Sequence, residues 1–513
     1  MDKETKKGIK ISDILLYVVF TLLMIFVISM KIDYHMDETL TYGLSNHAGS
    51  YYMEPIDGIR YEPSIQPYID YLGATSLSPS SFWIPYINQA SDSHPPIYYM
   101  IIHFVCGLFK RTFSRWQAGS VNILFALGTL FLVRKMISLL TDNKLIYRSL
   151  SWAFVFCSAI LSEVSFFRMY VMVIFLTTLT TYLFIWQIEK ERGILFYALI
   201  SIVVLTGALT HYGTLIYSAL ICITYGIYLL IHKKWKDAVI FCVLMGIAAG
   251  IAIGVYPAII HHVFGAGRGG ESIGNLFDLS DIFSRYFEYF SFFDRFVFGR
   301  MLILILVSIV VLFFYQKKKD HLKLDEKTAM KYIIVIVPAA LFFCVAAKSS
   351  PYIEERYTSA IYATVFVGVL CPLMILVSKC FNEKIARIVT VSFLLLMSLI
   401  SLAGNGWQYL YRHEKKNFDI LDNYAENDCI CIYSGESWRI NTYIIELTKY
   451  NSLTFIKQGD IDQYDLESFI TTDNGIIVLA GVFDDSYMNE VMERLPDYKG
   501  YDYLCERSFF VYR

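Results

Sequence analysis

Long apolar runs separated by short polar stretches dominate the chain as far as about residue 404. Most are long enough to cross a bilayer, for which an α-helix needs about 20 apolar residues. They predict about eleven membrane spans, at residues 12–30, 117–138, 146–162, 169–187, 194–210, 212–232, 238–260, 299–315, 330–347, 357–378 and 386–404. The apolar segment 96–109 is short for a span and precedes Lys110 and Arg111. We expect it to form an amphipathic helix in the membrane interface.

The pattern changes after residue 404, where short strand-like runs alternate with helical ones. Runs such as 428–434, 452–457, 475–481 and 505–513 suggest strands, and 438–450 and 486–495 suggest helices. Alternation of this kind predicts a small α/β layer structure. No glycine-rich phosphate fingerprint accompanies it. We therefore divide the chain into a membrane domain, residues 1–404, and a C-terminal α/β domain, residues 405–513, which we expect to cap the outer face.

Composition supports a polytopic α-helical membrane protein. The 513 residues are 56% hydrophobic and only 18% charged, and the mean hydropathy is +0.47. Soluble domains carry about 25% charged residues. The net charge of −2 and the absence of a basic stripe with interleaved aromatics give no sign of nucleic-acid binding.

Basic residues divide between the loops as the positive-inside rule requires. The N-terminus and the loops near residues 134–148, 190–192, 233–236, 317–323 and 379–387 are lysine- and arginine-rich. This predicts a multi-pass protein of the cell membrane with a cytoplasmic N-terminus and an extracytoplasmic C-terminal domain, and we expect that membrane to be a bacterial plasma membrane. The large outward loops are then 31–116 and 261–298.

Cysteine and histidine patterns do not predict a metal site. None of the ten cysteines has CxxC spacing, and most lie in or beside apolar segments, as buried hydrophobes do. His261 and His262 are adjacent but have no clear third ligand.

An acidic pair, Asp37 and Glu38, follows the first span directly. Carboxylates at the mouth of a membrane helix are costly to desolvate, which makes them functional candidates. The alternative is a solvated pair in an ordinary loop.

The other outward pieces supply further polar candidates. His94 precedes two prolines that fix an extended approach to a helix, and Tyr98 follows them. Glu163 and Arg168 lie in the turn between two spans, where they could simply pair. Basic residues usually gather on the cytoplasmic side, so Arg168, Lys348 and Arg356 on the outer side indicate an anionic partner. The alternative is that they snorkel from the ends of the spans to the interface. The remaining candidates of this group are Tyr170, His211, Lys348, Arg356 and Tyr357.

Together these motifs resemble the GT-C superfamily of membrane glycosyltransferases. The order is one span, the acidic pair, and a long outward loop that closes in DSHPPIYY at residues 92–99. This order is similar to family 39, which includes the protein O-mannosyltransferases and the aminoarabinose transferases. RMY at 168–170, LTHYG at 209–213 and ERY at 355–357 add to the resemblance.

The resemblance implies a sugar donor linked to polyprenyl phosphate and an inverting transfer at the outer face. It places the catalytic base on Asp37, with Glu38 orienting the acceptor or serving as the base instead, and Glu163 supporting. A carboxylate takes the proton of the attacking hydroxyl, and fixed cations stabilise the leaving phosphate. Two departures stand out: His94 replaces a frequent lysine, and Phe166 stands where many relatives carry an acidic residue. Dependence on a divalent metal stays open.

Two other functions compete with the transferase. A transporter or flippase of lipid-linked polysaccharide intermediates predicts charged or broken segments deep within several spans. A non-catalytic cell-envelope scaffold requires nothing of Asp37. Within the transferase interpretation, the sugar could be a hexose, pentose or amino sugar. The acceptor could be a lipid, a wall polymer or a protein.

Overall fold

The computed structural model describes residues 11–48, 52–74, 78–265, 267–278, 280–319, 325–481 and 485–513. The chain forms two compact units. The helical unit contains the chain up to Ile28, Gln89–Tyr98 and Gly119–Gly406. The sheet unit contains Ser29–Asn88, Tyr99–Ala118 and Trp407–Arg513.

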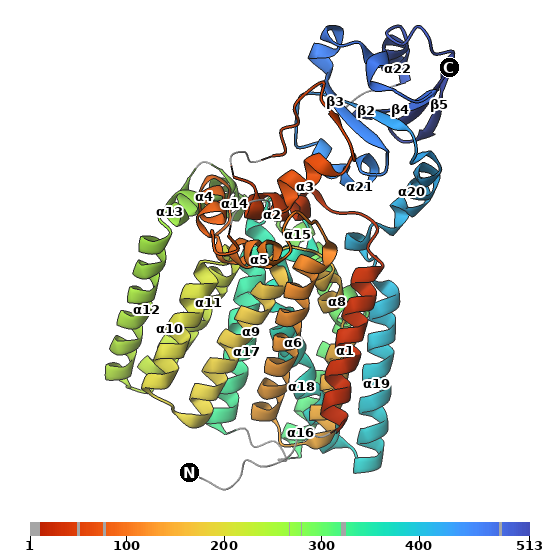
Figure 1. Ribbon diagram of the computed structural model, residues 1–513. Helices are drawn as coiled ribbons and strands as arrows, with labels where there is room; N and C mark the ends of the chain where they lie inside the picture. Colours follow the sequence, from red (N-terminus) through yellow and green to blue (C-terminus); the bar gives the residue numbers. More distant parts are fainter. Residues whose placement is uncertain are drawn as a thin grey trace. The chain divides into compact units, whose positions relative to one another are not determined.

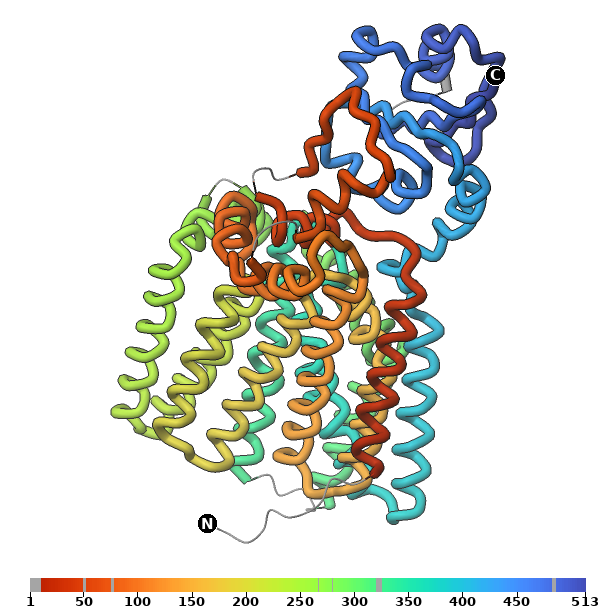
Figure 2. Tube along the Cα trace, in the orientation of Figure 1, coloured from red at the N-terminus to blue at the C-terminus, as the bar shows by residue number. Residues whose placement is uncertain are grey.

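Long apolar helices build the helical unit, where they run side by side (Figures 1 and 2). They are α1 (Ile11–Ser29), α6 (Arg115–Leu140), α7 (Lys144–Val155), α8 (Ser158–Val164), α9 (Tyr170–Lys190), α10 (Ile194–Ala208), α11 (Tyr212–Ile231), α12 (Trp235–Val255), α16 (Leu302–Lys318), α17 (Glu326–Ser349), α18 (Tyr362–Cys380) and α19 (Glu383–Gly404). Side-chain caps fix several starts: Asn143 caps α7, Asp325 caps α17 and Asn382 caps α19. Each cap satisfies backbone N–H groups that would otherwise lack a partner.

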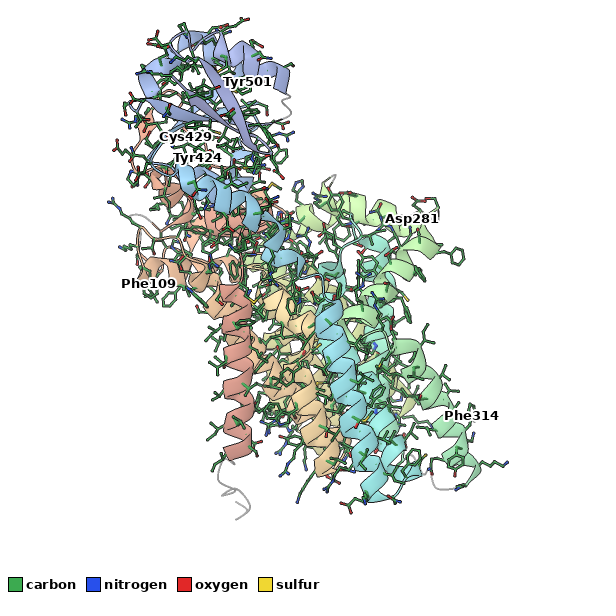
Figure 3. All side chains as sticks on the ribbon, turned by 90° about the vertical axis from the view of Figure 1, so that its right-hand side faces the viewer. Phe109, Asp281, Phe314, Tyr424, Cys429 and Tyr501 are labelled. Atoms are coloured by element: carbon green, nitrogen blue, oxygen red, sulfur yellow. The ribbon has the colours of Figure 1, made fainter. Side chains whose placement is uncertain are left out.

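The protein is a multi-pass membrane protein. Within the described residues, eight helices are long and apolar enough to span a bilayer, and two bent pairs raise the number to ten. The predicted span 194–210 corresponds to α10, whose 15 residues make it shorter than each of these eight helices. Helix α9 lies inside the unit, since 78% of its most apolar 18-residue stretch is buried, whereas only 22% of that stretch is buried in α12. Exposed apolar side chains such as Phe314 cover the outside of α16 (Figure 3), as contact with lipid requires.

One predicted span is bent, and a second bend lies just before another predicted span. The segment predicted as one helix over 146–162 is α7 and α8, which meet at an angle of 42°. The second bend, of 85°, separates α16 from the helical segment Ile282–Val297. That segment consists of α15 (Ile282–Phe292) and the π-helical turn Phe293–Val297. Such breaks turn polar ends of helices toward the places where loops meet.

Short helices form the loop regions of the helical unit. They are α13 (Ala258–Phe264), α14 (Arg268–Phe277) and the 3-10 helix η2 (Glu355–Ile361), which leads directly into α18. Within the predicted outward loop 261–298, the structure contains the amphipathic α15, with Phe283 and Phe287 exposed.

The sheet unit is built on six strands, ordered β1-β3-β2-β4-β6-β5. The strands are β1 (Arg60–Tyr61), β2 (Asp428–Tyr433), β3 (Ser452–Lys457), β4 (Asn474–Ala480), β5 (Gly500–Cys505) and β6 (Ser508–Tyr512). The central β2 is parallel to β3 and to β4, and the other pairs are antiparallel. β1 comes from the first loop, and Arg60 reinforces it with a 2.8 Å bond to Asp428 at the start of β2.

The predicted α/β character of the C-terminal segment is confirmed, with local differences. Isoleucines of β2, β3 and β4 pack with α22 (Asp485–Met492) in one core cluster, in which Ile430, Ile456 and Ile477 are fully buried. The predicted strand 505–513 contains β6, which pairs with the unpredicted β5 in a hairpin that has Glu506 at φ 40° in the turn. The predicted helix 438–450 contains only the 3-10 turn Ile440–Thr442 and the short α21 (Ile444–Leu447).

Small helices complete the sheet unit. They are α2 (Met36–Asn46), α3 (Gln66–Leu72), most of α4 (Trp83–Ser91) and of α5 (Ile97–Leu108), α20 (Lys415–Leu421), and 3-10 turns at Gln408–Leu410, Arg412–Glu414, Asp422–Tyr424, Gln458–Gln463 and Leu466–Phe469. The predicted interfacial segment 96–109 corresponds to α5. Phe104, Leu108 and Phe109 are exposed along one of its edges (Figure 3 shows Phe109), as an amphipathic interfacial helix requires. All ten cysteines lie within the described residues and carry free thiols.

Candidate active site

In the helical unit, the structure brings His94 and Arg168 together. His94 lies just before α5, and Arg168 lies in the turn between α8 and α9. Arg168 Nη2 is 3.2 Å from His94 Nε2, and the other ring nitrogen of His94 is 2.9 Å from Ser93 Oγ. Because a guanidinium only donates hydrogen bonds, His94 accepts at Nε2 in this pairing. The two residues are 74 positions apart in the chain, so this contact depends on the tertiary fold.

His211 joins this pair as the N-cap of α11. Its Nδ1 accepts a 3.0 Å hydrogen bond from the Gly213 amide, so the neutral ring carries its proton on Nε2. Its ring centroid lies 5.7 Å from that of His94 and 5.6 Å from that of Tyr170. Burial lowers the pKa of His211 to about 3, and the positive charge of Arg168 acts in the same direction. His211 is therefore a neutral N–H donor at physiological pH.

Arg356 adds a second guanidinium next to these residues. It is buried in η2, and its Nε lies 2.5 Å from Glu354 Oε2. The guanidinium lies over the rings of Phe166 and Tyr357, at 5.5 and 5.4 Å. Its positive charge also lowers the pKa of His211, as does that of Arg168. We call His94, Arg168, His211 and Arg356 the cationic cluster.

Aromatic side chains form the walls of the cationic cluster. Phe166 and Tyr170 stack with ring centroids 5.8 Å apart and planes 11° from parallel. Phe166 also contacts Arg356, and Tyr170 also contacts His211, so the two stacked rings link these groups. Tyr98 is fully buried, and its hydroxyl donates a 3.0 Å bond to Asn122. Tyr98 therefore anchors the start of α5 beside His94.

Glu163 and Lys348, two other candidates, have different surroundings. Glu163 is 1% exposed, and neither carboxylate oxygen has a hydrogen-bond partner within the described residues. Its simple pairing with Arg168 is not formed. Lys348 is buried, and its Nζ lies 2.6 Å from Asp281 at the start of α15. This pairing lowers the pKa of Asp281 to about 2. Lys348 thus fixes a loop, and its charge is already compensated.

Tyrosines and a histidine that the sequence did not single out for the site support the His94 segment. The Tyr256 hydroxyl donates a 3.2 Å bond to the His94 carbonyl. Tyr212 bonds to His262 Nδ1 at 2.7 Å, and His262 Nε2 lies 3.3 Å from the Ala90 carbonyl. These bonds hold both ends of the turn before α5. Tyr212, within THYG, was the only one with a visible sequence signal.

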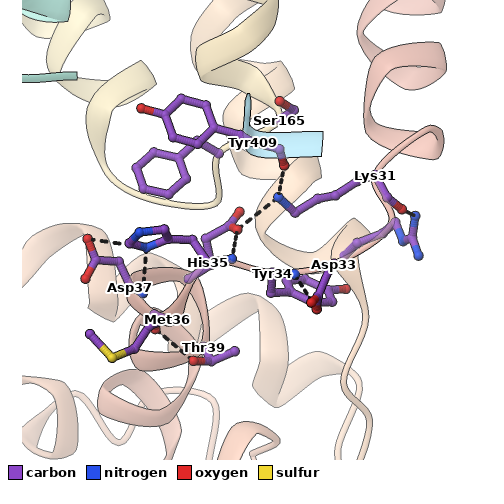
Figure 4. Close-up of polar contacts among 12 residues, drawn as sticks. Lys31, Asp33, Tyr34, His35, Met36, Asp37, Thr39, Ser165 and Tyr409 are labelled. Carbon is purple, nitrogen blue, oxygen red and sulfur yellow. Dashed lines mark hydrogen bonds and ion pairs between the residues drawn. The ribbon is translucent and has the colours of Figure 1, made fainter. Parts of the chain in front are cut away.

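In the sheet unit, the acidic pair begins α2, and its two members differ. Glu38 is fully buried, and its Oε2 lies 2.9 Å from Lys31 Nζ. The same oxygen accepts a 2.7 Å bond from the His35 amide, which completes a capping box (Figure 4). Lys31 also donates to the Tyr409 carbonyl. Burial lowers the pKa of Lys31, and the attraction of Glu38 opposes this effect. Glu38 is thus committed to a buried ion pair.

Asp37 remains more accessible. Its side chain is 21% exposed, whereas that of Glu38 is 0% exposed. The Asp37 amide donates a 3.0 Å bond to His35 Nδ1 (Figure 4), which fixes the turn that carries the carboxylate. The first turn of a helix also favours negative charge. Of the two carboxylates, Asp37 is the more exposed.

Comparison with known proteins gives structural matches only. No protein-family model matches the sequence, and no curated protein matches it. The fold is similar to that of ArnT from Cupriavidus metallidurans in the apo state, with a TM-score of 0.50 and 10% identity over 97% of each chain. The chain has the GT-C fold.

Two further solved structures are similar to this chain. ArnT from Cupriavidus metallidurans bound to undecaprenyl phosphate matches with a TM-score of 0.47 and 10% identity over 97% of each chain. An Archaeoglobus fulgidus oligosaccharyltransferase in complex with zinc and sulfate has a TM-score of 0.45 and 11% identity. This last match covers 90% of this chain and 68% of the archaeal one.

Possible metal-ligating side chains are not grouped in the described part of the chain. No three histidine, cysteine or acidic side chains there are placed to hold an ion. His261 and His262 have ring centroids 6.3 Å apart, and His262 is already bonded to Tyr212.

Proposed function

We propose that the protein is a membrane glycosyltransferase that moves a sugar from a polyprenyl-phosphate carrier to an acceptor hydroxyl at the outer face of the membrane. The observation that carries this proposal is the cationic cluster. Three segments far apart in the chain bring His94, Arg168 and His211 together, and Arg356 adds a fourth group. Fixed cations and N–H donors of this kind suit a phosphate.

The proposed reaction is a single displacement. The acceptor hydroxyl attacks the anomeric carbon of the donor, and Asp37 takes the hydroxyl proton. The bond between the anomeric carbon and the phosphate oxygen breaks, and its electron pair leaves with the phosphate. Arg168 and Arg356 stabilise the negative charge that develops there, and His211 donates from Nε2. Attack opposite the leaving group inverts the anomeric configuration.

Asp37 is proposed as the base in preference to Glu38 because of their pairing. Glu38 is buried in the ion pair with Lys31 and accepts the His35 amide. A proton transferred to Glu38 would leave Lys31 without a counter-charge in a buried place, which costs several kcal/mol. The Asp37 carboxylate lies 3.7 Å from His35 Nδ1 and is partly exposed, so a proton on Asp37 can still be exchanged with solvent. Glu38 then serves as a positioning residue for the turn.

The remaining assignments belong to the same proposal. Residues 1–404 form the transferase domain, with a cytoplasmic N-terminus, and residues 405–513 form an extracytoplasmic domain. Tyr98, Tyr170 and Tyr357 shape the phosphate site through the contacts described above. Glu163 supports this region, because the positive charge of Arg356 lies close enough to act on its buried carboxyl group.

Sugar transfer tests the base. Membranes that contain wild-type protein, Asp37→Asn, Glu38→Gln or Asp70→Asn would be given a panel of labelled polyprenyl-phosphate sugars. Asp70 is a matched control, since it lies in the same loop and pairs only with Gln66. We expect Asp37→Asn to lose at least about 100-fold in rate, in line with general-base catalysis. Wild-type transfer by a monodisperse Asp37→Asn protein would refute the assignment.

Lipid-phosphate binding tests the cationic cluster separately. Purified protein would be titrated with undecaprenyl phosphate, and binding followed by native mass spectrometry. Arg168→Gln should weaken binding about tenfold or more, because it removes a charged hydrogen-bond donor. The exposed Arg387 gives the matched control Arg387→Gln. Equal binding by Arg168→Gln and Arg387→Gln would exclude the cluster as the phosphate site.

A further inference from the structure

The sheet unit contains a pocket of about 250 Å³ that the proposed transfer does not yet use. Its walls come from the segment after α1, from the start of α6 and from α21. They include Tyr34, Phe113, Arg115, Trp116, Ile444 and Thr448. The volume is below the 300–1,000 Å³ of typical small-molecule sites, so the pocket suits one small unit of a larger substrate.

Arg115 gives this pocket a positive charge. Its Nη1 donates to the Lys31 carbonyl at 2.5 Å and to the Ser29 carbonyl at 3.4 Å. Within the described residues, no carboxylate forms an ion pair with Arg115, although the neighbouring Lys31 is paired with Glu38. A guanidinium that is held by backbone carbonyls and lacks a counter-ion is prepared to bind an anion, because its planar fork fits a carboxylate or a phosphate.

Aromatic rings form the other walls. Tyr34 is buried, and its ring lies 5.1 Å from that of Phe113. Phe113 is held in turn by an edge contact with Tyr42 at 4.9 Å. Trp116, at the rim, is 42% exposed. Rigid rings with a polar edge offer a large amphipathic contact surface at a low entropy cost. The C–H face of a pyranose ring is apolar and its edge is polar, so it matches such walls.

We propose that this pocket, the Arg115 pocket, binds an anionic sugar unit of the acceptor, either a hexuronate or a hexose phosphate. The assignment of this ligand as the acceptor rests on the proposed function. A chain of contacts connects the pocket to the candidate base: Arg115 bonds the carbonyl of Lys31, and the Nζ of Lys31 pairs with Glu38, next to Asp37. An acceptor sugar in the pocket is thus held by the short segment that also carries the base.

Direct binding tests this inference without any donor or transfer. Full-length protein in detergent would be examined by saturation-transfer NMR with glucuronate, glucose 6-phosphate, glucose and glycerol 3-phosphate. We expect the two anionic sugars to bind with at least tenfold higher affinity than glucose, because they carry a negative charge that can bind Arg115 and glucose does not. Glycerol 3-phosphate, which has the phosphate but no ring, should bind more weakly than glucose 6-phosphate.

Variants locate the binding. Arg115→Gln should reduce the affinity for glucuronate about tenfold, and Lys110→Gln, at an exposed lysine nearby, should not change it. If Arg115→Gln fails to fold, Trp116→Ala should lower the affinity for both anionic sugars through the lost stacking surface. Unchanged binding in Arg115→Gln or Trp116→Ala, equal binding of glycerol 3-phosphate, or no binding of either anionic sugar would overturn the proposal. Binding of the anionic sugars without any transfer by the wild-type protein would support the pocket and count against the transferase alone.

Discussion

The buried pair Lys31–Glu38 gives a prediction whose size follows from the structure. The two charged atoms are 2.9 Å apart, and the side chains are 1% and 0% exposed. Their attraction is about 6 kcal/mol at an effective dielectric constant of about 20. Desolvation of two ions costs a similar amount, so the intact pair contributes little net stability. Removal of one partner is different, because the other remains buried with its charge uncompensated.

We therefore expect Lys31→Met to destabilise the sheet unit by about 3–5 kcal/mol. For a unit of this size, that corresponds to a fall in apparent melting temperature of roughly 10 °C. The double variant Lys31→Met/Glu38→Gln should recover more than half of the loss. It removes both charges, and glutamine can still accept the His35 amide as the third residue of a capping box.

Melting of purified protein, followed by intrinsic fluorescence, would measure both effects. With Glu38→Gln measured alone as well, the variants form a double-mutant cycle, and the coupling is the effect of the double variant minus the sum of the two single effects. A Lys31→Met protein that melts within 2 °C of wild type, on the scale of roughly 10 °C expected above, would refute the reasoning. So would a double variant that melts no higher than the single one, because the cost would then not come from an uncompensated charge.

Three other substitutions test local features of the structure. Burial raises the pKa of Asp33 from 3.8 to about 7, so the folded protein holds a proton that the unfolded chain releases in this range. Stability should fall as pH rises from about 4 to about 7, and Asp33→Asn should abolish this slope in melting temperature; an unchanged slope would contradict the assignment. Gly43→Ala places a Cβ 2.1 Å from the Tyr71 ring and should cost about 1–3 kcal/mol, measured by melting. The control Gly226→Ala, whose Cβ meets nothing within 4 Å, should be neutral or stabilising. His211→Ala should melt lower than His211→Asn by an amount equivalent to about 1 kcal/mol, because only asparagine can replace the cap; equal melting would show that the cap contributes little.

The membrane helices were largely predictable, because each apolar run has a length fixed by the bilayer. The bend between α7 and α8 was not, since no proline or glycine within residues 146–162 marks the break. Helix α10 was expected as a span, yet it has only 15 residues. In the C-terminal segment, β2, β3 and β4 followed from isoleucine- and valine-rich runs. β5 was missed, because Asp502 interrupts its apolar pattern and its first four residues are partly or fully exposed.

The candidate site divides in the same way. Residue type and position in the outward loops identified His94, Arg168, His211 and Arg356, and the structure places them near one another. The difference between Asp37 and Glu38 could not be predicted, because it depends on Lys31 and on a carbonyl 378 residues further along the chain. Contacts over such a separation leave no periodicity in the sequence.

The pairing of β1 with β3 also concerns time. Arg60 is synthesised 368 residues before its partner Asp428. At 5–20 residues per second, the ribosome needs roughly 20–75 s to make the intervening chain. During that interval the first loop has neither the edge of the sheet nor the carbonyl that receives the Lys31 ammonium group. Segments that are synthesised after α19 therefore complete the fold of the first loop. A chain that stops after α19 would carry the acidic turn at Asp37 and Glu38 in an unfinished loop.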